Sequence, residues 1–310
     1  MATAIQSNMQ YVGTRVLPNI IDNITDTATM TEYLKKILAT VGGDVSYVTD
    51  ANSDALFNTL KAHRARVIAD GGRVLSIANT LKAIIFAHKN ALIDSDYSAY
   101  APDFGIKLSG STVIKVYDLS GRDMRVLTGV IEQTVDAKHN VITNLNAATL
   151  IATSSIIGAT GLILGSSLHD GDAGSSTTQT ARGMYLSDNA DGTGAGVGSL
   201  ETNNGGISRL YYKRASDSVM TSLPYDQTAN YKKYSGLVGY MSNSNSRVEI
   251  YENNVLKAGS NAAQIDLSAI NLYPTISMPA LNSFIRESWL IRSTSQVLAQ
   301  SLSSHLDKSV

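Results

Sequence analysis

Cysteine is absent from this chain of 310 residues, and charged residues are scarce. Without thiols the chain has no disulfides and no thiolate metal sites, so burial, hydrogen bonds and subunit contacts must stabilise it. Lys, Arg, Asp and Glu make up 16% of the residues, against roughly 25% in ordinary globular proteins. The formal net charge is -1, and a basic stripe typical of nucleic-acid binding is missing. We therefore expect a surface of Ser, Thr, Asn and Tyr, and no nucleic-acid partner.

Charge is missing altogether between Val141 and Leu168, a stretch long enough to consider as a membrane span. The stretch contains many Thr, Ser and Asn residues and several glycines, which a helix in hydrocarbon does not tolerate. Successive buried strands explain it better, so no membrane span is expected. Residues 1–17 lack a basic segment followed by an apolar run and do not resemble a secretory signal.

Apolar residues at helical spacing predict a helical domain over residues 27–96, behind an extended arm over residues 1–26. The first helix starts at Thr27 and ends at two glycines, 42 and 43. The second is expected to begin after Ser53 as its N-cap, and the third after Ser76. At this size a helical docking domain and a second domain fit the chain better than one core.

From residue 104 to 310 the pattern changes to short β-type runs separated by Gly, Ser and Asn. These runs predict strands over residues 106–108, 113–117, 126–131, 141–145, 156–164, 184–186, 207–213, 236–241, 247–251, 255–258 and 287–291. Asn253 and Asn254 lie between two such runs and predict a β-hairpin, because Asn tolerates the positive φ of a two-residue turn. The spacing of Val297, Leu298, Leu302 and Leu306 predicts a closing helix that lies against the strands. The fold class is therefore α+β, with a small helical domain before a β-sandwich and a C-terminal helix.

No residue pattern assembles a catalytic site, and we expect no enzyme. The five histidines fall in different segments without metal-ligand spacing, and His88 is expected to pack on the apolar stripe of the third helix. Glu249 and Glu252 are the nearest approach to a glycosidase pair. Their odd spacing puts them on opposite faces of a strand, so they cannot share one cleft.

Two acidic loops offer oxygen ligands of the kind that Ca²⁺ takes. The first contains Asp170 and Asp172, and the second contains Asp188, Asn189 and Asp191. Neither completes a calcium-loop pattern, and Asp and Asn also favour plain turns. Turns are the preferred interpretation, no cofactor is expected, and calcium stays open as the alternative.

Tyrosines cluster in the sequence between residues 211 and 234. They are Tyr211, Tyr212, Tyr225, Tyr231 and Tyr234. Aromatic rings with hydroxyl and amide neighbours serve as stacking platforms for sugars. These residues are the candidate glycan-binding site, while tyrosines packed in a sheet or a subunit interface are the preferred interpretation of the cluster.

Several segments resemble structural proteins of tailed bacteriophages that carry a concanavalin A-like, laminin-G-type jelly roll after a small helical domain. The resemblance rests on residues 69–72 (Ala-Asp-Gly-Gly), 104–105 (Phe-Gly) and 116–121 (Val-Tyr-Asp-Leu-Ser-Gly). Later segments that fit are 237–240 (Leu-Val-Gly-Tyr), the strand pair through 248–257, and residues 289–306. The resemblance implies a concanavalin A-like sandwich and a fibre, a head or tail appendage, or a collar component.

This resemblance implies a virion protein that is assembled in the host cytoplasm and docks through its N-terminal region to capsid, portal, collar or tail proteins. The sandwich would project outward, as a homodimer or homotrimer, for attachment to the host surface. A glycan-binding adhesin or lectin module is the alternative function. A polysaccharide-cleaving enzyme is a third, and it lacks the carboxylate pair.

Overall fold

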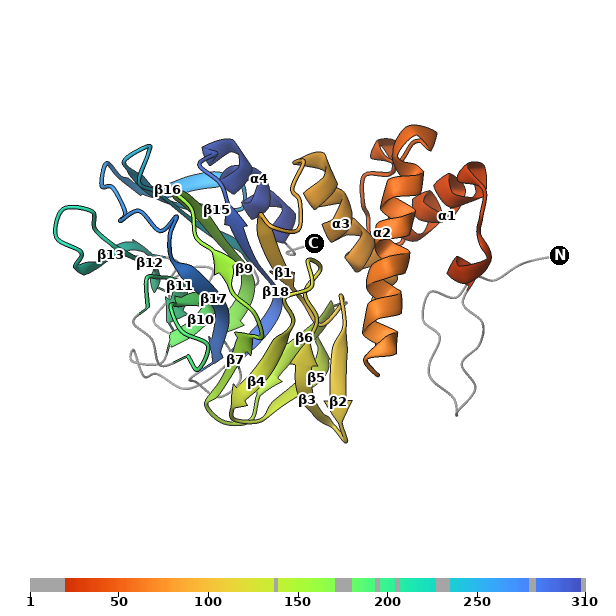
Figure 1. Cartoon of the computed structure of the whole chain (residues 1–310), viewed down its shortest axis with the longest axis horizontal. Helices are drawn as coiled ribbons and strands as arrows, with labels where there is room; N and C mark the ends of the chain where they lie inside the picture. Colours follow the sequence, from red (N-terminus) through yellow and green to blue (C-terminus); the bar gives the residue numbers. More distant parts are fainter. Residues whose placement is uncertain are drawn as a thin grey trace.

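The computed structural model describes residues 20–136, 139–170, 180–192, 196–203, 207–226, 235–278 and 283–307. It confirms the predicted fold class: an N-terminal helical region, an antiparallel β-sandwich and a C-terminal helix (Figure 1). Residues 1–19 of the expected arm lie outside the described residues. Ile21 and Ile24, at the end of that arm, are buried among the helices.

The helical region contains three α-helices and two short 3-10 helices. In chain order they are η1 (Ile20–Asn23), α1 (Thr27–Ala39), η2 (Val45–Tyr47), α2 (Asp50–Ala69) and α3 (Ile77–Lys89). The predicted cap of the third helix is confirmed, since Ser76 accepts from the amide of Asn79 at 3.2 Å. The predicted cap of the second is wrong. Thr49 and Asn52 form a capping box that starts α2 earlier, and Ser53 is buried inside the helix.

Eighteen strands follow in the described residues, and then α4 (Gln296–Leu306). The strands are β1 (Tyr97–Tyr100), β2 (Ile106–Ser109), β3 (Thr112–Val116), β4 (Met124–Thr128), β5 (Ile131–Asp136), β6 (His139–Asn144), β7 (Ala148–Ala152), β8 (Ile156–Ile157), β9 (Gly161–Asp170), β10 (Thr180–Ser187), β11 (Gly198–Asn203), β12 (Ile207–Lys213), β13 (Met220–Asp226), β14 (Ser235–Ser242), β15 (Arg247–Glu252), β16 (Val255–Ser260), β17 (Asn271–Met278) and β18 (Ser283–Arg292). The predicted hairpin is confirmed: Asn253 and Asn254 have φ of 48° and 69° and join β15 to β16.

The strands form two facing sheets. The inner sheet, beside the helices, has β1 and β6 next to β18, followed by β9, β14, β15 and β16. The outer sheet has the order β4, β7, β17, β10, β11, β12 and β13. Strands β5 and β3 connect β6 to β4 and close one side of the sandwich. At the other side, β13 and β16 pair only with β12 and β15 among the described residues.

The described residues form three apolar cores, which follow one another from the sandwich to the helical region. The first fills the space between the two sheets, and the third lies among α1, α2 and α3. The second packs α3 and α4 on the helix-facing side of the inner sheet, around the buried ring of Trp289. Leu298, Leu302 and Leu306 of α4 belong to this core as predicted, whereas Val297 is 76% exposed, so its predicted inward position is wrong.

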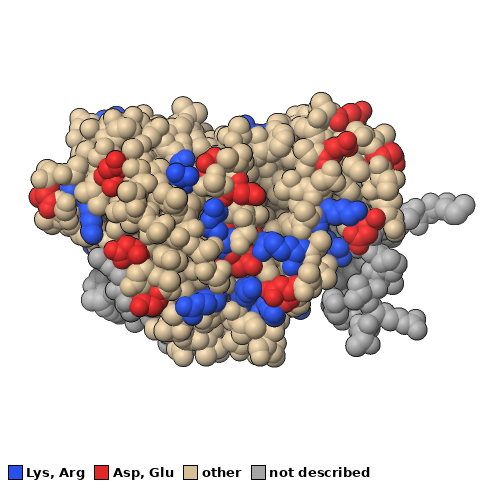
Figure 2. Space-filling model, in the orientation of Figure 1, with Lys and Arg blue, Asp and Glu red and all other residues tan. Residues whose placement is uncertain are grey.

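Polar contacts also tie α2 to the sandwich. Asp70 accepts from Nζ of Lys115 at 2.8 Å and from the hydroxyl of Tyr117 at 2.7 Å, and these bonds hold its pKa well below the usual range. Arg66 Nη1 donates to Oδ1 of Asp123 at 2.7 Å. Figure 2 shows charged side chains of both signs gathered where these strands meet α2, while most of this face is uncharged. The helices and the sandwich therefore form one body.

Three of the segments that carry the phage resemblance, residues 69–72, 104–105 and 116–121, meet at this junction. A Cβ added at Gly72 would lie 2.4 Å from the ring of Tyr117, so only glycine lets the chain pass there. The carboxyl of Asp118 is fully buried and accepts from the amide of Ala99 at 2.6 Å. Burial raises the pKa of this carboxyl. These residues join the helical region to the sandwich.

Candidate functional site

One row of side chains crosses the outer sheet on the face turned away from the core. Strand register places its members opposite one another on seven successive strands: Arg125, Ile151, Thr275, Tyr185, Ser199, Tyr211 and Ser222. Their chain neighbours Leu150, Leu186 and Leu210 belong to the core between the sheets. Because side chains alternate along a strand, this outer row points away from that core.

Two tyrosines of the outer row flank a hydroxyl group. Tyr185 and Tyr211 lie opposite Ser199 from either side, which places their backbones two strand spacings apart, about 9–10 Å. The hydroxyl of Ser199 donates to Oε1 of Glu201 at 2.8 Å. Aromatic rings with hydroxyl and carboxylate groups between them suit a ligand that has both apolar faces and hydroxyls.

The described residues of the link between β10 and β11 lie against the middle of the outer row, with Gly192 near Ile151 and Gly196 near Tyr185. A Cβ added at Gly196 would lie 2.5 Å from the ring of Tyr185, so glycine is needed for this close approach. Ser199 and Thr275 are almost completely buried, whereas Tyr211 is half-buried and Ser222 is exposed. The row is therefore accessible at its two ends, at the exposed Arg125 on β4 and at Tyr211 and Ser222 at the β12–β13 end.

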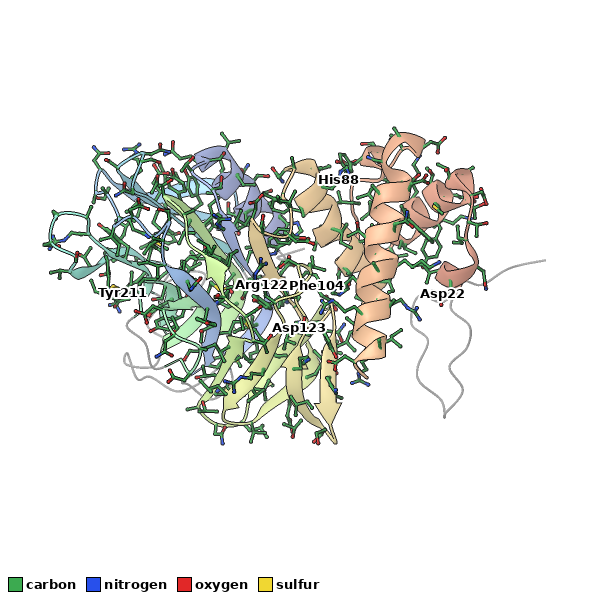
Figure 3. The ribbon with its side chains drawn as sticks, viewed as in Figure 1. Asp22, His88, Phe104, Arg122, Asp123 and Tyr211 are labelled. Atoms are coloured by element: carbon green, nitrogen blue, oxygen red, sulfur yellow. The ribbon has the colours of Figure 1, made fainter. Side chains whose placement is uncertain are left out.

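At that end, a patch of mixed character covers the outward side of the β12–β13 hairpin. We call it the hairpin patch, and it consists of Arg209, Tyr211 and Lys213 on β12 and Met220, Ser222 and Pro224 on β13. Two cations flank the Tyr211 ring along β12. Figure 3 shows Tyr211 on the far side of the sandwich from Phe104 and Asp123, which lie where the strands meet the helices.

The structure separates the tyrosines that are close in the sequence. Tyr212 points the opposite way from Tyr211 and is 4% exposed in the core between the sheets. Tyr225 also points inward, and its hydroxyl donates to Oε2 of Glu252 at 2.8 Å. Burial, with this hydrogen bond, raises the pKa of Tyr225. Tyr231 and Tyr234 lie outside the described residues.

The acidic loop residues can be placed in part. Asp172 lies outside the described residues, and the side chain of Asp170 is not described. Asp188 and Asp191 are exposed in the link after β10, where Asn189 Oδ1 accepts from the amide of Asp191 at 2.9 Å, a turn contact. In the part of the chain that the structure describes, no three His, Asp or Glu side chains converge as a metal site would require.

The two glutamates of β15 lie on opposite faces, as predicted from their spacing. Glu249 accepts from the hydroxyl of Tyr251 at 2.6 Å on the side that faces α4. Glu252 faces the space between the sheets and accepts from Tyr225. Each carboxylate is therefore held in a separate structural hydrogen bond.

The predicted packing of His88 on the apolar stripe of the third helix is wrong. The residue is exposed at the end of α3, where its Nδ1 lies 2.6 Å from the hydroxyl of Tyr47, and it does not belong to the apolar stripe. His63 is the buried histidine of the helical region. Its Nε2 lies 2.8 Å from the carbonyl oxygen of Phe104, and burial lowers its pKa to about 4. Both have structural contacts.

Sequence reasoning missed most of the hairpin patch. The strand over residues 207–213 is predicted correctly. If Leu210 faces the core, alternation of side chains along the strand places Arg209, Tyr211 and Lys213 together on the opposite face. Strand β13 gives no such signal, because Pro224 disfavours a strand and its outward side carries few β-formers. Tyr185 is distant in sequence and joins Tyr211 only through strand pairing.

No family model matches this chain, and no curated protein matches it. Among solved structures, it is similar to the binding domains of botulinum neurotoxin serotypes D and G. Each has a TM-score of 0.45 and 12% identity over 68% of this chain and 50% of the other. The binding domain of botulinum neurotoxin DC in complex with SialylT has a TM-score of 0.42 and 13% identity over 63% and 52%. The chain thus spans about half the length of these neighbours, and similarity at this level does not indicate a ligand.

None of the helices in the described ranges is both long enough and apolar enough to span a membrane.

Proposed function

We propose that this chain is a non-catalytic recognition protein whose sandwich binds saccharide at the β12–β13 end of the outer row. The observation that carries this proposal is the register that brings Tyr185, Ser199, Tyr211 and Ser222 into one line across four strands. Tyr211 supplies a ring at the accessible β12–β13 end, with the exposed hydroxyl of Ser222 beside it. This arrangement gives one stacking surface and several hydrogen-bonding groups in a fixed sheet.

The chemistry of the hairpin patch fits a sugar better than an apolar ligand. Its tyrosine and proline offer flat surfaces to C–H groups, while Arg209, Lys213 and Ser222 donate hydrogen bonds to hydroxyl oxygens. Because these side chains project from paired strands, little backbone conformational entropy is lost when a ligand binds. The paired strands give the site a preformed shape.

The helical region would serve as the base of this module. Its polar and apolar contacts with the sandwich make one rigid body, which suits a protein that holds a binding surface away from an anchoring point. Three segments of the phage resemblance lie at this junction. On that resemblance, we propose a component of a tailed-bacteriophage virion, attached through its N-terminal part to capsid, portal, collar or tail proteins and assembled in the host cytoplasm.

A homo-oligomer, dimer or trimer, would add avidity to weak individual sites. The mass of the full-length protein in solution, measured by light scattering, tests this part. A dimer or trimer supports multivalent attachment, and a monomer at all concentrations contradicts it.

The saccharide proposal is tested by applying the full-length protein to an array of surface polysaccharides and oligosaccharides. We expect binding to a defined group of glycans, which Tyr211→Ala lowers at least tenfold while Tyr47→Ala, in the helical region, leaves it unchanged. Silence across the array would contradict recognition and favour a second candidate, a purely structural virion component. The rigid junction around Asp70 and Tyr117 is the observation that favours this candidate.

A further inference from the structure

A cavity of about 480 Å³ opens at the end of the sandwich, where the turn after β12 meets the link after β16. Both segments are at the left of Figure 1. Sites for small ligands have volumes of about 300–1,000 Å³. The cavity is lined by Arg214, Ala215, Ser216, Asn261, Ala262 and Ala263.

Backbone hydrogen bonds fix the two walls of this cavity to each other. The amide of Ala215 donates to the carbonyl of Ala263, and the amide of Ile265 donates to the carbonyl of Lys213, both at 2.9 Å. Between them, Arg214 and Gln264 form an isolated antiparallel bridge. The cavity is therefore preformed and does not require ordering of a free loop.

The polar groups on the walls are mainly donors. Nη1 of Arg247 donates to Oδ1 of Asn261, so the amide of Asn261 offers its NH₂ group to a ligand. The Arg214 side chain is 43% exposed, and its Nη2 donates to Oδ2 of Asp217 at 2.6 Å. A guanidinium carries five N–H donors, so most of those on Arg214 remain available. Ser216 adds a hydroxyl.

Two buried polar atoms beside the cavity have no hydrogen-bond partner among the described residues. They are Nε of Arg214 and Oε1 of Gln264, on the two residues of the isolated bridge. Unpaired buried polar atoms are destabilising. A ligand that draws the guanidinium into the cavity would let these groups find partners.

We propose that this cavity binds an acidic monosaccharide, with its carboxylate on the Arg214 guanidinium and the Asn261 amide. Ala215 on one wall and Ala262 and Ala263 on the other provide apolar surface for the C–H groups of the sugar ring. The excess of donors on the cavity walls favours an anion over a neutral sugar, and arginine is the side chain that fits a carboxylate with two parallel bonds. This is a second site, separate from the hairpin patch.

The test titrates the full-length protein with glucuronate, glucose and acetate and follows amide chemical shifts by NMR. Glucuronate and glucose differ only in the carboxylate, and acetate lacks the ring. We expect glucuronate to shift the amides of residues 214–216 and 261–263 and to bind at least tenfold more tightly than either control. Equal binding of glucose, or of acetate, would overturn the proposal.

Two variants give opposite results if the carboxylate binds Arg214. Arg214→Gln should weaken glucuronate binding at least tenfold. Asp217→Asn should strengthen it about threefold, because it removes the anion that competes for the guanidinium and keeps the Oδ1 that accepts from the Val219 amide at 3.0 Å. A folding defect would weaken binding in both, so a gain in Asp217→Asn cannot come from misfolding. Unchanged affinity in both variants would overturn the assignment.

The outcome is independent of the saccharide proposal for the hairpin patch. Tyr211→Ala should leave glucuronate binding unchanged, and Arg214→Gln should leave binding of neutral glycans unchanged. A loss of glucuronate binding in Tyr211→Ala would place the sugar acid on the patch and overturn the cavity assignment.

Discussion

Nε2 of His63 on α2 lies 2.8 Å from the carbonyl oxygen of Phe104, across the boundary between the helices and the sandwich. The ring is 5% exposed, and burial lowers its pKa from 6.5 to about 4. The neutral ring therefore donates its N–H to this carbonyl.

Acidification should weaken the fold through His63. Because the pKa is depressed in the folded state, the unfolded chain takes up the proton first, and stability falls as the pH drops from about 6.5 towards 4. Over this pH range the free energy of unfolding falls by about 3 kcal/mol. Urea denaturation at several pH values measures it. His63→Gln, which can donate to the same carbonyl without titrating, should lose this part of the pH dependence, and an unchanged slope would contradict the assignment.

Gly72→Ala should destabilise the junction. The added methyl would lie 2.4 Å from the ring of Tyr117, and overpacking of this kind costs about 1–3 kcal/mol. Gly259→Ala is the matched control, because its methyl would meet its first neighbour at 3.6 Å. Thermal denaturation should give a lower melting temperature for Gly72→Ala than for Gly259→Ala. Equal melting temperatures would contradict the predicted clash with Tyr117.

Leu302→Ala should loosen α4 on the inner sheet. Leu302 is fully buried in the core around Trp289, and loss of such a side chain costs about 2–5 kcal/mol. Trp289 is the one tryptophan of the chain, so its fluorescence reports this core directly. We expect emission from a ring shielded from water in the native protein and faster quenching by acrylamide in the variant. Quenching equal to that of the native protein would contradict this packing.

The turn between β15 and β16 should prefer glycine to alanine at residue 254. Asn254 has a φ of 69°, where a Cβ is strained and glycine is not. Asn254→Ala should cost about 1 kcal/mol, and Asn254→Gly should be neutral or slightly stabilising. Asn253 is less suitable for this comparison, because its Oδ1 accepts from the amide of Gly236 at 2.7 Å. A destabilised glycine variant would contradict the expected turn.

Local patterns predict most elements of this fold. The helices, thirteen of the eighteen described strands and the Asn253–Asn254 hairpin follow from periodicity and turn chemistry, as the structure confirms for α1, β12 and β16. One predicted strand over residues 126–131 is two, β4 and β5, because the chain turns at Gly129, whose φ is 78°. Another, over residues 156–164, is interrupted between β8 and β9. Strands such as β1, β7, β11, β13 and β17 were not predicted, because they are short or have mixed composition.

The candidate site could be predicted only in part. The sequence draws attention to Tyr211, but it also groups Tyr212 with it, although alternation along β12 turns these neighbours to opposite faces. The partners of Tyr211 in the outer row come from strands that are distant in sequence. Tyr185 is one of them, and only the pairing of β10, β11 and β12 brings it close.

The most direct test of saccharide recognition measures the affinity of one glycan from the array for the native protein, Tyr211→Phe and Tyr211→Ala by calorimetry. If the Tyr211 ring stacks on the sugar, the phenylalanine variant should bind within about threefold of the native protein, and the alanine variant at least tenfold more weakly, a loss of about 1.4 kcal/mol. Equal affinity of all three proteins would contradict the account.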